Sequence, residues 1–97
     1  MKVIHKFGPL SQYGTVAVYG RPVHVDKQDE FGGEQVYMWC EVDQSQVNCY
    51  VSTHMVRYIP TGFQNYGNDE DYFGTVVMSS GLVWHVLTKK VNNGCDR

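Results

Sequence analysis

The sequence contains no apolar stretch that could cross a membrane, since a spanning helix needs roughly 20 apolar residues and polar residues interrupt every candidate earlier. The opening segment, MKVIHKFGPLSQYG, does not contain the continuous apolar core of a secretory signal. The three cysteines, Cys40, Cys49 and Cys95, are too few for a disulfide framework. We therefore expect a cytoplasmic protein with reduced thiols and no membrane partner.

Positive charge is also scarce, because only eight Lys and Arg residues are scattered along the chain and the net charge is −2. Nucleic-acid phosphates attract clustered Lys and Arg, so we expect no direct binding to nucleic acid. The four histidines match no CxxC, HxH or HExxH spacing, and we expect neither a metal nor another cofactor. No nucleophile elbow or family-specific cysteine signature is present, so we do not expect an enzyme.

The residues that are present favour β-structure in one small domain. The chain has 97 residues, and glycine and proline recur along it about every ten residues, which leaves little room for helices. β-branched and aromatic residues fill the gaps between them. We predict an all-β fold: a single antiparallel-sheet domain of six to seven strands over residues 1–90, with a flexible tail at 91–97. This domain would be a sandwich or a partly open barrel with at most one short helical turn.

The strands are predicted at residues 2–7, 15–19, 22–27, 36–42, 47–58, 72–78 and 82–87. Residues 28–34 and 59–71 are predicted as loops. In the last hairpin, Gly81 fits the left-handed position that closes a three-residue turn. The same pairing places His85 across from Thr75, and alternation within a strand places His24 and Asp26 on one face.

The stretch VYMWCEVDQSQVNCYV, residues 36–51, predicts the central hairpin. With its turn at Gln44 and Ser45, Cys40 would face Cys49 on an apolar inner side. Trp39 would then face Tyr50 on the opposite side. Two interpretations of that aromatic side remain open: a second layer covers it, or it is an exposed patch that binds a partner.

A second candidate surface lies in the segment QNYGNDEDYFG, residues 64–74. It carries three consecutive acidic residues near Tyr66, which could dock onto a basic groove or could simply be solvated. A third hypothesis is that Arg21 or Arg57 meets the phosphate of a small nucleotide while aromatic rings stack on its base.

Four motifs, VHVDKQ, VYMWCEVD, PTG and YFGTVVMSSGLVWHVL, occur in that order over residues 20–88. They resemble a family of short proteins of unknown function, encoded mostly by bacteriophages and prophages. The pattern of that family is V-x-V-x-x-Q, L-W-A-L-V-D, G-T-G-H, Y-I-G-T and L-V-W-H-L. Phe63 stands where the pattern has its histidine, so this chain does not carry a functional histidine there.

The resemblance implies a phage-encoded accessory protein in the host bacterial cytoplasm. We expect it to inhibit a host anti-phage defence protein through an aromatic and acidic surface. The alternative is an oligomeric binding protein that sequesters a small signalling nucleotide, and a homo-oligomer is compatible with both. The candidate partner-binding residues are Tyr37, Trp39, Tyr50, Tyr66, Asp69, Glu70 and Asp71.

Overall fold

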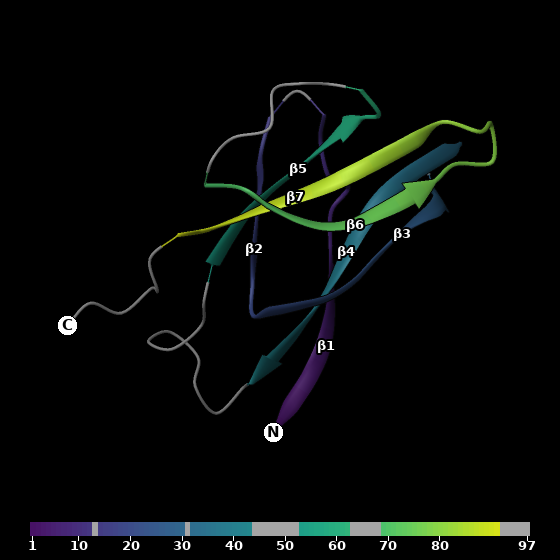
Figure 1. The fold of residues 1–97 in the computed structure, drawn as a ribbon. Coiled ribbons are helices and arrows are strands. Elements are labelled where there is room, and N and C mark those ends of the chain that lie inside the picture. The colour runs from purple at the N-terminus through teal and green to yellow at the C-terminus, as the bar shows by residue number, and fades with distance from the viewer. Residues whose placement is uncertain (13, 31, 44–52, 63–68, 92–97) are drawn as a thin grey trace.

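The computed structural model describes residues 1–12, 14–30, 32–43, 53–62 and 69–91. Within these ranges the chain forms strands and turns and no helix. The strands are β1 (Lys2–Phe7), β2 (Val16–Tyr19), β3 (Arg21–Glu30), β4 (Gly33–Asp43), β5 (Thr53–Pro60), β6 (Asp71–Val77) and β7 (Val83–Val91). They form two antiparallel sheets that do not close into a barrel (Figure 1). The predicted all-β class with six to seven strands is therefore confirmed.

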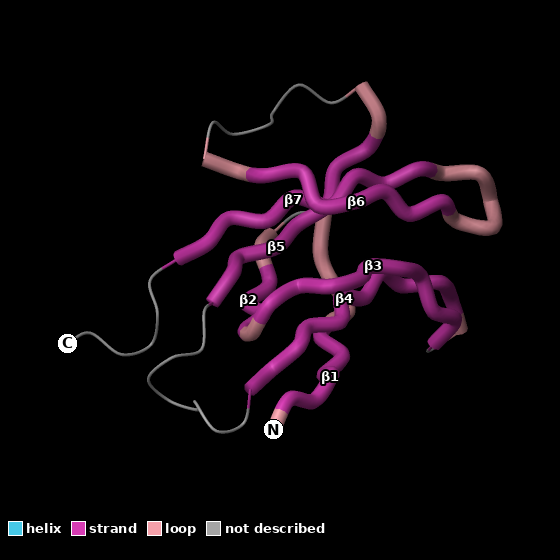
Figure 2. The backbone as a smooth tube through the Cα atoms, turned by 60° about the horizontal axis from the view of Figure 1, so that its bottom comes forward, coloured by secondary structure: helices cyan, strands magenta, loops and turns pink. Residues whose placement is uncertain are grey.

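The two sheets are the two layers of the molecule (Figure 2). The three-stranded sheet has the order β1-β4-β3, and the four-stranded sheet has the order β2-β5-β7-β6. The edge strand β3 lies along the edge strand β6 of the other sheet. Each sheet consequently has an inner face toward the other sheet and an outer face that points away from it, although Ile59 and Leu87 on the outer face of the four-stranded sheet are buried.

The core between the sheets is built from alternate residues of the strands. On β4, Val36, Met38 and Cys40 point inward, and on the opposite sheet Val56 and Val86 meet them. All five side chains are buried. Because burying an apolar side chain of this size contributes about 1.5–3 kcal/mol, this alternation fixes which face of β4 points outward.

Gly20 joins the two sheets, because it connects β2 of one sheet to β3 of the other. Its φ is +97°, a region that favours glycine. A Cβ atom at this position would lie 2.6 Å from the backbone oxygen of Glu41 and 2.9 Å from a methyl group of Val42. The crossover can therefore pass this close to β4 only without a side chain.

A second connection between the sheets is polar. The backbone N–H of Ser79, in the β6–β7 turn, donates to Glu34 Oε1 at 3.0 Å, and the Ser79 hydroxyl donates to the other oxygen. These hydrogen bonds lower the pKa of the Glu34 carboxyl. They hold the end of the β6–β7 hairpin against the start of β4.

The predicted hairpin between residues 36–42 and 47–58 is wrong. Both edges of β4 are already occupied, by β1 and β3, and β5 pairs with β2 and β7 in the other sheet. Cys40 faces His5 and Pro22, while Trp39 faces Lys6 and His24. Cys49 and Tyr50 lie outside the described residues. The expected side for each residue of β4 is nevertheless confirmed, since Cys40 points inward and Trp39 outward.

The interpretation of residues 28–34 as a loop is also wrong. β3 and β4 continue as a hairpin, in which Gln28 pairs with Gln35 and Glu30 with Gly33. Polar side chains are compatible with this pairing because their outer face is solvated. The last hairpin is confirmed: Gly81 has a φ of +95°, and Thr75 faces His85. Of the predicted tail at 91–97, Val91 is the last residue of β7, and residues 92–97 lie outside the described residues, as does the middle of the long loop, 63–68.

Candidate functional site

Trp39 lies in the outer face of the three-stranded sheet. It is half-buried, and its ring centroid lies 5.6 Å from that of His24 on β3. His24 shares this face with Asp26, as predicted, and their side chains approach to 3.8 Å. Ile4 on β1 faces Glu41, which is the next outward-pointing residue of β4 after Trp39. The Ile4 side chain is 56% exposed. We call Ile4, His24 and Trp39 the outer apolar patch.

Tyr37 lies on the same face but is only 2% exposed. Its hydroxyl donates to the carboxylate of Glu30, and the ammonium of Lys6 lies 4.6 Å from the centre of its ring. Lys6 is held there by Gln28 at 2.8 Å and Glu30 at 3.1 Å. Of the two interpretations of the aromatic side, the covered one therefore applies to Tyr37. Lys6 of β1 and the backbone at Gly8 lie against the ring, and a Cβ atom on Gly8 would be 2.8 Å from it.

The titration behaviour of this cluster follows from the same contacts. The hydrogen bond from Tyr37 and then the ammonium of Lys6 lower the pKa of the Glu30 carboxyl. The hydrogen bond to Glu30, together with burial, raises the pKa of the Tyr37 hydroxyl. Tyr37 therefore stays protonated as a donor and fixes the end of β3 against β4.

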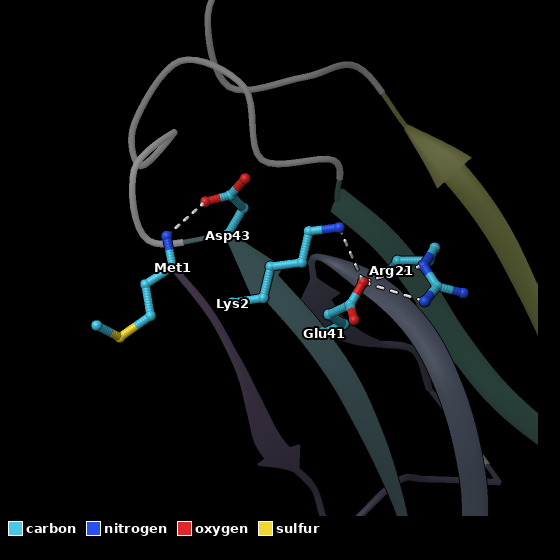
Figure 3. Close-up of polar contacts among 5 residues, drawn as sticks. All are labelled: Met1, Lys2, Arg21, Glu41 and Asp43. Carbon is cyan, nitrogen blue, oxygen red and sulfur yellow. Dashed lines mark hydrogen bonds and ion pairs between the residues drawn. The ribbon is translucent and has the colours of Figure 1, made fainter.

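Positive side chains gather around Glu41 at one end of the sheet (Figure 3). Glu41 faces Ile4 of the outer apolar patch. The guanidinium of Arg21 lies 3.0 Å from Glu41 Oε1, and the ammonium of Lys2 lies 3.9 Å from the same oxygen. Asp43 pairs with the amino group of Met1 at 3.5 Å. Because the Arg21 and Lys2 side chains are 69% and 63% exposed, two cations that share one carboxylate remain accessible to an acidic partner.

The predicted acidic residues belong to the other sheet. Both carboxylate oxygens of Glu70 accept hydrogen bonds from Arg57 at 2.7 Å. Asp69 lies 2.9 Å from the ammonium of Lys89, and Asp71 is exposed at the first position of β6. Arg57 and Lys89 both point outward from the four-stranded sheet, so the structure does not bring the acids together with Trp39.

These ion pairs change the charge that the predicted acidic surface presents. The hydrogen bond from Lys89 lowers the pKa of the Asp69 carboxyl, and the same contact raises the pKa of the Lys89 ammonium. The hydrogen bond to Glu70 likewise raises the pKa of Arg57. Each of the two acids is thus ionised beside a cation, which reduces its attraction for a basic groove. Tyr50 and Tyr66 lie outside the described residues.

The nucleotide hypothesis relied on Arg21 or Arg57 as a phosphate ligand. Each guanidinium has a carboxylate partner, Glu41 for Arg21 and Glu70 for Arg57. A nucleotide phosphate would have to compete with Glu70 for Arg57, whose side chain is only 20% exposed, whereas the more exposed Arg21 is open to a further anion. The alternative function of nucleotide sequestration stays a prediction.

A row of polar side chains crosses the outer face of the four-stranded sheet. The Nδ1 atom of His85 lies 3.0 Å from Thr75 Oγ1, and its Nε2 atom lies 2.8 Å from Thr61 Oγ1. The hydroxyl of Tyr72 hydrogen-bonds to Thr75. We call Thr61, Tyr72, Thr75 and His85 the hydroxyl–histidine row. These residues come from segments 60–62 and 72–87, on which the family resemblance partly rests.

The sequence analysis identified only one contact of this row, between Thr75 and His85, because those residues face each other in a local hairpin. Thr61 reaches His85 through the pairing of β5 with β7, in which Ile59 faces His85. No spacing in the sequence indicates that pairing. Tyr72 reaches Thr75 because a β-bulge shifts the register between Tyr72 and Gly74.

The fold and these two outer faces define a small β domain of two packed sheets. The chain belongs to a family defined by a domain of unknown function, DUF7352, whose model matches residues 1–94. No curated protein and no solved structure matches the chain. Among the described residues, no helix has the length and apolar character needed to span a membrane.

Proposed function

We propose that this chain is a phage-encoded accessory protein that binds and inhibits a host anti-phage defence protein in the bacterial cytoplasm. The phage origin and the host target rest on the resemblance of residues 20–88 to short phage and prophage proteins. The contact surface is the outer face of the three-stranded sheet, with Trp39 at its centre.

The observation that carries this proposal is the outer apolar patch. Ile4 and the Trp39–His24 pair place aliphatic and aromatic surface on a solvated sheet face. Tryptophan is among the residues that dominate binding energy when a partner buries them. A partner that covers this patch would remove apolar surface from water at about 25 cal/mol per Å².

The charges beside the patch specify the chemistry of the partner. Arg21 and Lys2 share the single carboxylate of Glu41 and project into solvent at one end of the sheet. Acidic groups on a partner would complement this end, and such complementarity accelerates association and fixes orientation. The proposed partner surface is therefore apolar at its centre and acidic at one margin.

The test begins with affinity capture from host lysate, followed by purification of the captured protein and titration calorimetry. Trp39→Ala should weaken binding by about 30-fold or more, which corresponds to a hot spot of about 2 kcal/mol. Arg21→Gln should mainly reduce the association rate and its dependence on salt. Inhibition of the partner should be lost in parallel with binding.

The control is Val77→Thr, because Val77 is an apolar residue of β6 in the other sheet whose exposure, 57%, is close to the 56% of Ile4 in the outer apolar patch. Circular dichroism of every variant separates weak binding from misfolding. If Trp39→Ala and Val77→Thr bind the purified partner as tightly as wild type, the outer apolar patch is not the interface.

A further inference from the structure

The hydroxyl–histidine row has the arrangement of a nucleophile, a base and a group that orients the base. We propose that Thr61 is an acyl-accepting nucleophile activated by His85, and that this site hydrolyses small esters. The site lies on the four-stranded sheet and is independent of the binding surface proposed above.

The geometry satisfies the distances that such a site needs. The nucleophile and the base lie 2.8 Å apart, from Thr61 Oγ1 to His85 Nε2, within the 2.6–3.2 Å range of hydrogen-bonded catalytic pairs. The other ring nitrogen, Nδ1, lies 3.0 Å from Thr75 Oγ1. Thr75 and the hydroxyl of Tyr72 behind it are positioning residues, because they act through His85.

The side chains of the row form a continuous chain of hydrogen bonds, and the tautomer of His85 decides in which of two directions the protons are donated along it. In one direction Thr61 donates to Nε2, the Nδ1–H group donates to Thr75, and Thr75 donates to Tyr72. Only this direction leaves Nε2 as a proton acceptor for the Thr61 hydroxyl. The two tautomers of a neutral imidazole exchange in water, so the reactive form is available without a conformational change.

Thr61 lies at the surface of the described structure. Thr61 and Gly62 are both exposed in the turn after β5, and a Cβ atom built on Gly62 meets no atom of the described residues within 4 Å. Val77 faces Val83 as the next outward pair beyond Thr75 and His85. An uncrowded acyl group can therefore approach Thr61 and contact an apolar border.

The reaction proceeds in two steps with one proton exchanged in each. Thr61 Oγ1 attacks the ester carbonyl carbon while its proton passes to His85 Nε2, and the leaving alcohol departs with that proton. Water then attacks the threonyl ester, gives a proton to Nε2, and releases the carboxylic acid as that proton returns to Thr61 Oγ1. No oxidant, reductant or metal takes part in either step.

The test uses the full chain with p-nitrophenyl acetate, measuring p-nitrophenol release and locating the acetyl group by peptide mass mapping. Wild type should carry acetyl on Thr61, and Thr61→Ser should retain turnover. Thr61→Ala and His85→Gln should each lower the rate at least tenfold, since a positioned general base typically contributes about 10²–10⁴-fold. Thr75→Val should change the pH dependence of the rate while the acetyl group still maps to position 61.

The control is Thr15→Ala, which removes another exposed threonine hydroxyl far along the chain and should leave the rate unchanged. Circular dichroism shows whether each variant is folded, and the exposed turn position of Thr61 makes its substitutions structurally mild. Acetyl found only on lysines, or a Thr61→Ala rate equal to that of wild type, would overturn the proposal. Loss of ester hydrolysis does not bear on the proposed partner binding, which Trp39→Ala tests separately.

Discussion

Gly20 and Gly81 allow the steric demand of the sheet-to-sheet crossover to be measured with a matched control. Their φ angles are nearly equal, +97° and +95°. They differ in surroundings, because a Cβ atom on Gly20 would lie 2.6 Å from the backbone oxygen of Glu41, whereas one on Gly81 meets no atom within 4 Å. Alanine at each position therefore adds the same backbone strain, and only Gly20→Ala adds a collision with β4.

The magnitudes follow from these two contributions. A left-handed backbone costs an alanine roughly 1–2 kcal/mol, which is the whole expected loss for Gly81→Ala. Forcing an extra carbon into packed structure typically costs about 1–3 kcal/mol more, and the Glu41 oxygen cannot rotate away because it belongs to the backbone. We expect Gly20→Ala to lower the free energy of unfolding by about 2 kcal/mol more than Gly81→Ala.

Urea unfolding followed by circular dichroism measures both free energies, and thermal scans provide a second measure. A difference of about 2 kcal/mol corresponds to roughly 8–16 °C in Tm for a domain of this size. Equal losses in the two variants would refute the reasoning, because they would show that the crossover does not approach β4 as closely as the structure has it.

Three further predictions concern buried or paired groups. In a double-mutant cycle with Arg57→Ala and Glu70→Ala, the two-oxygen contact at 2.7 Å should give a coupling of about 1–2 kcal/mol; strictly additive losses would contradict it. Burial and the nearby Lys90 lower the pKa of His54, so the unfolded chain binds a proton first as the pH falls below about 6.5. Wild type should therefore lose stability from that pH downward more steeply than His54→Leu, as urea unfolding at several pH values would show. Burial raises the pKa of the Cys40 thiol to about 11, so iodoacetamide should label this cysteine only after denaturation, with peptide mapping separating it from Cys49 and Cys95.

The sequence predicted features that depend on neighbouring residues. Alternation along β4 is a property of one strand, and it correctly assigned Cys40 to the inner face and Trp39 to the outer face. The last hairpin is closed by its own turn, so the position of Gly81 and the contact between Thr75 and His85 were also accessible. In both cases the determining residues lie within about ten positions of one another.

Features that depend on distant pairing were not predictable in this way. The central hairpin is expected because adjacent strands usually pair, yet β4 has β1 and β3 as its two partners, and both precede it in the chain. Tyr37 is covered by Lys6, which is brought to it only by the pairing of β1 with β4. An alternating pattern says which side of a strand a residue occupies, but it does not say which strand lies next to it.

The acidic residues illustrate the same limit for electrostatics. Glu70 and Asp69 are neutralised by Arg57 and Lys89, which belong to β5 and β7. In the sequence these two residues and Asp71 are three consecutive acids in a segment predicted as a loop, and no neighbouring residue indicates that the sheet supplies cations to pair with them. The strands that pack beside an acidic segment therefore determine whether its charges are available to a partner.

The place of β1 also sets an order of events during synthesis. Among the described strands it pairs with β4 alone, and the end of β4 at Asp43 comes 36 residues after the end of β1 at Phe7. At about 5–20 residues per second, a ribosome needs roughly 2–7 s to produce them. During that interval the segment that becomes β1 has no strand to pair with, so Phe7 reaches its place opposite Met38 only after β4 has been made.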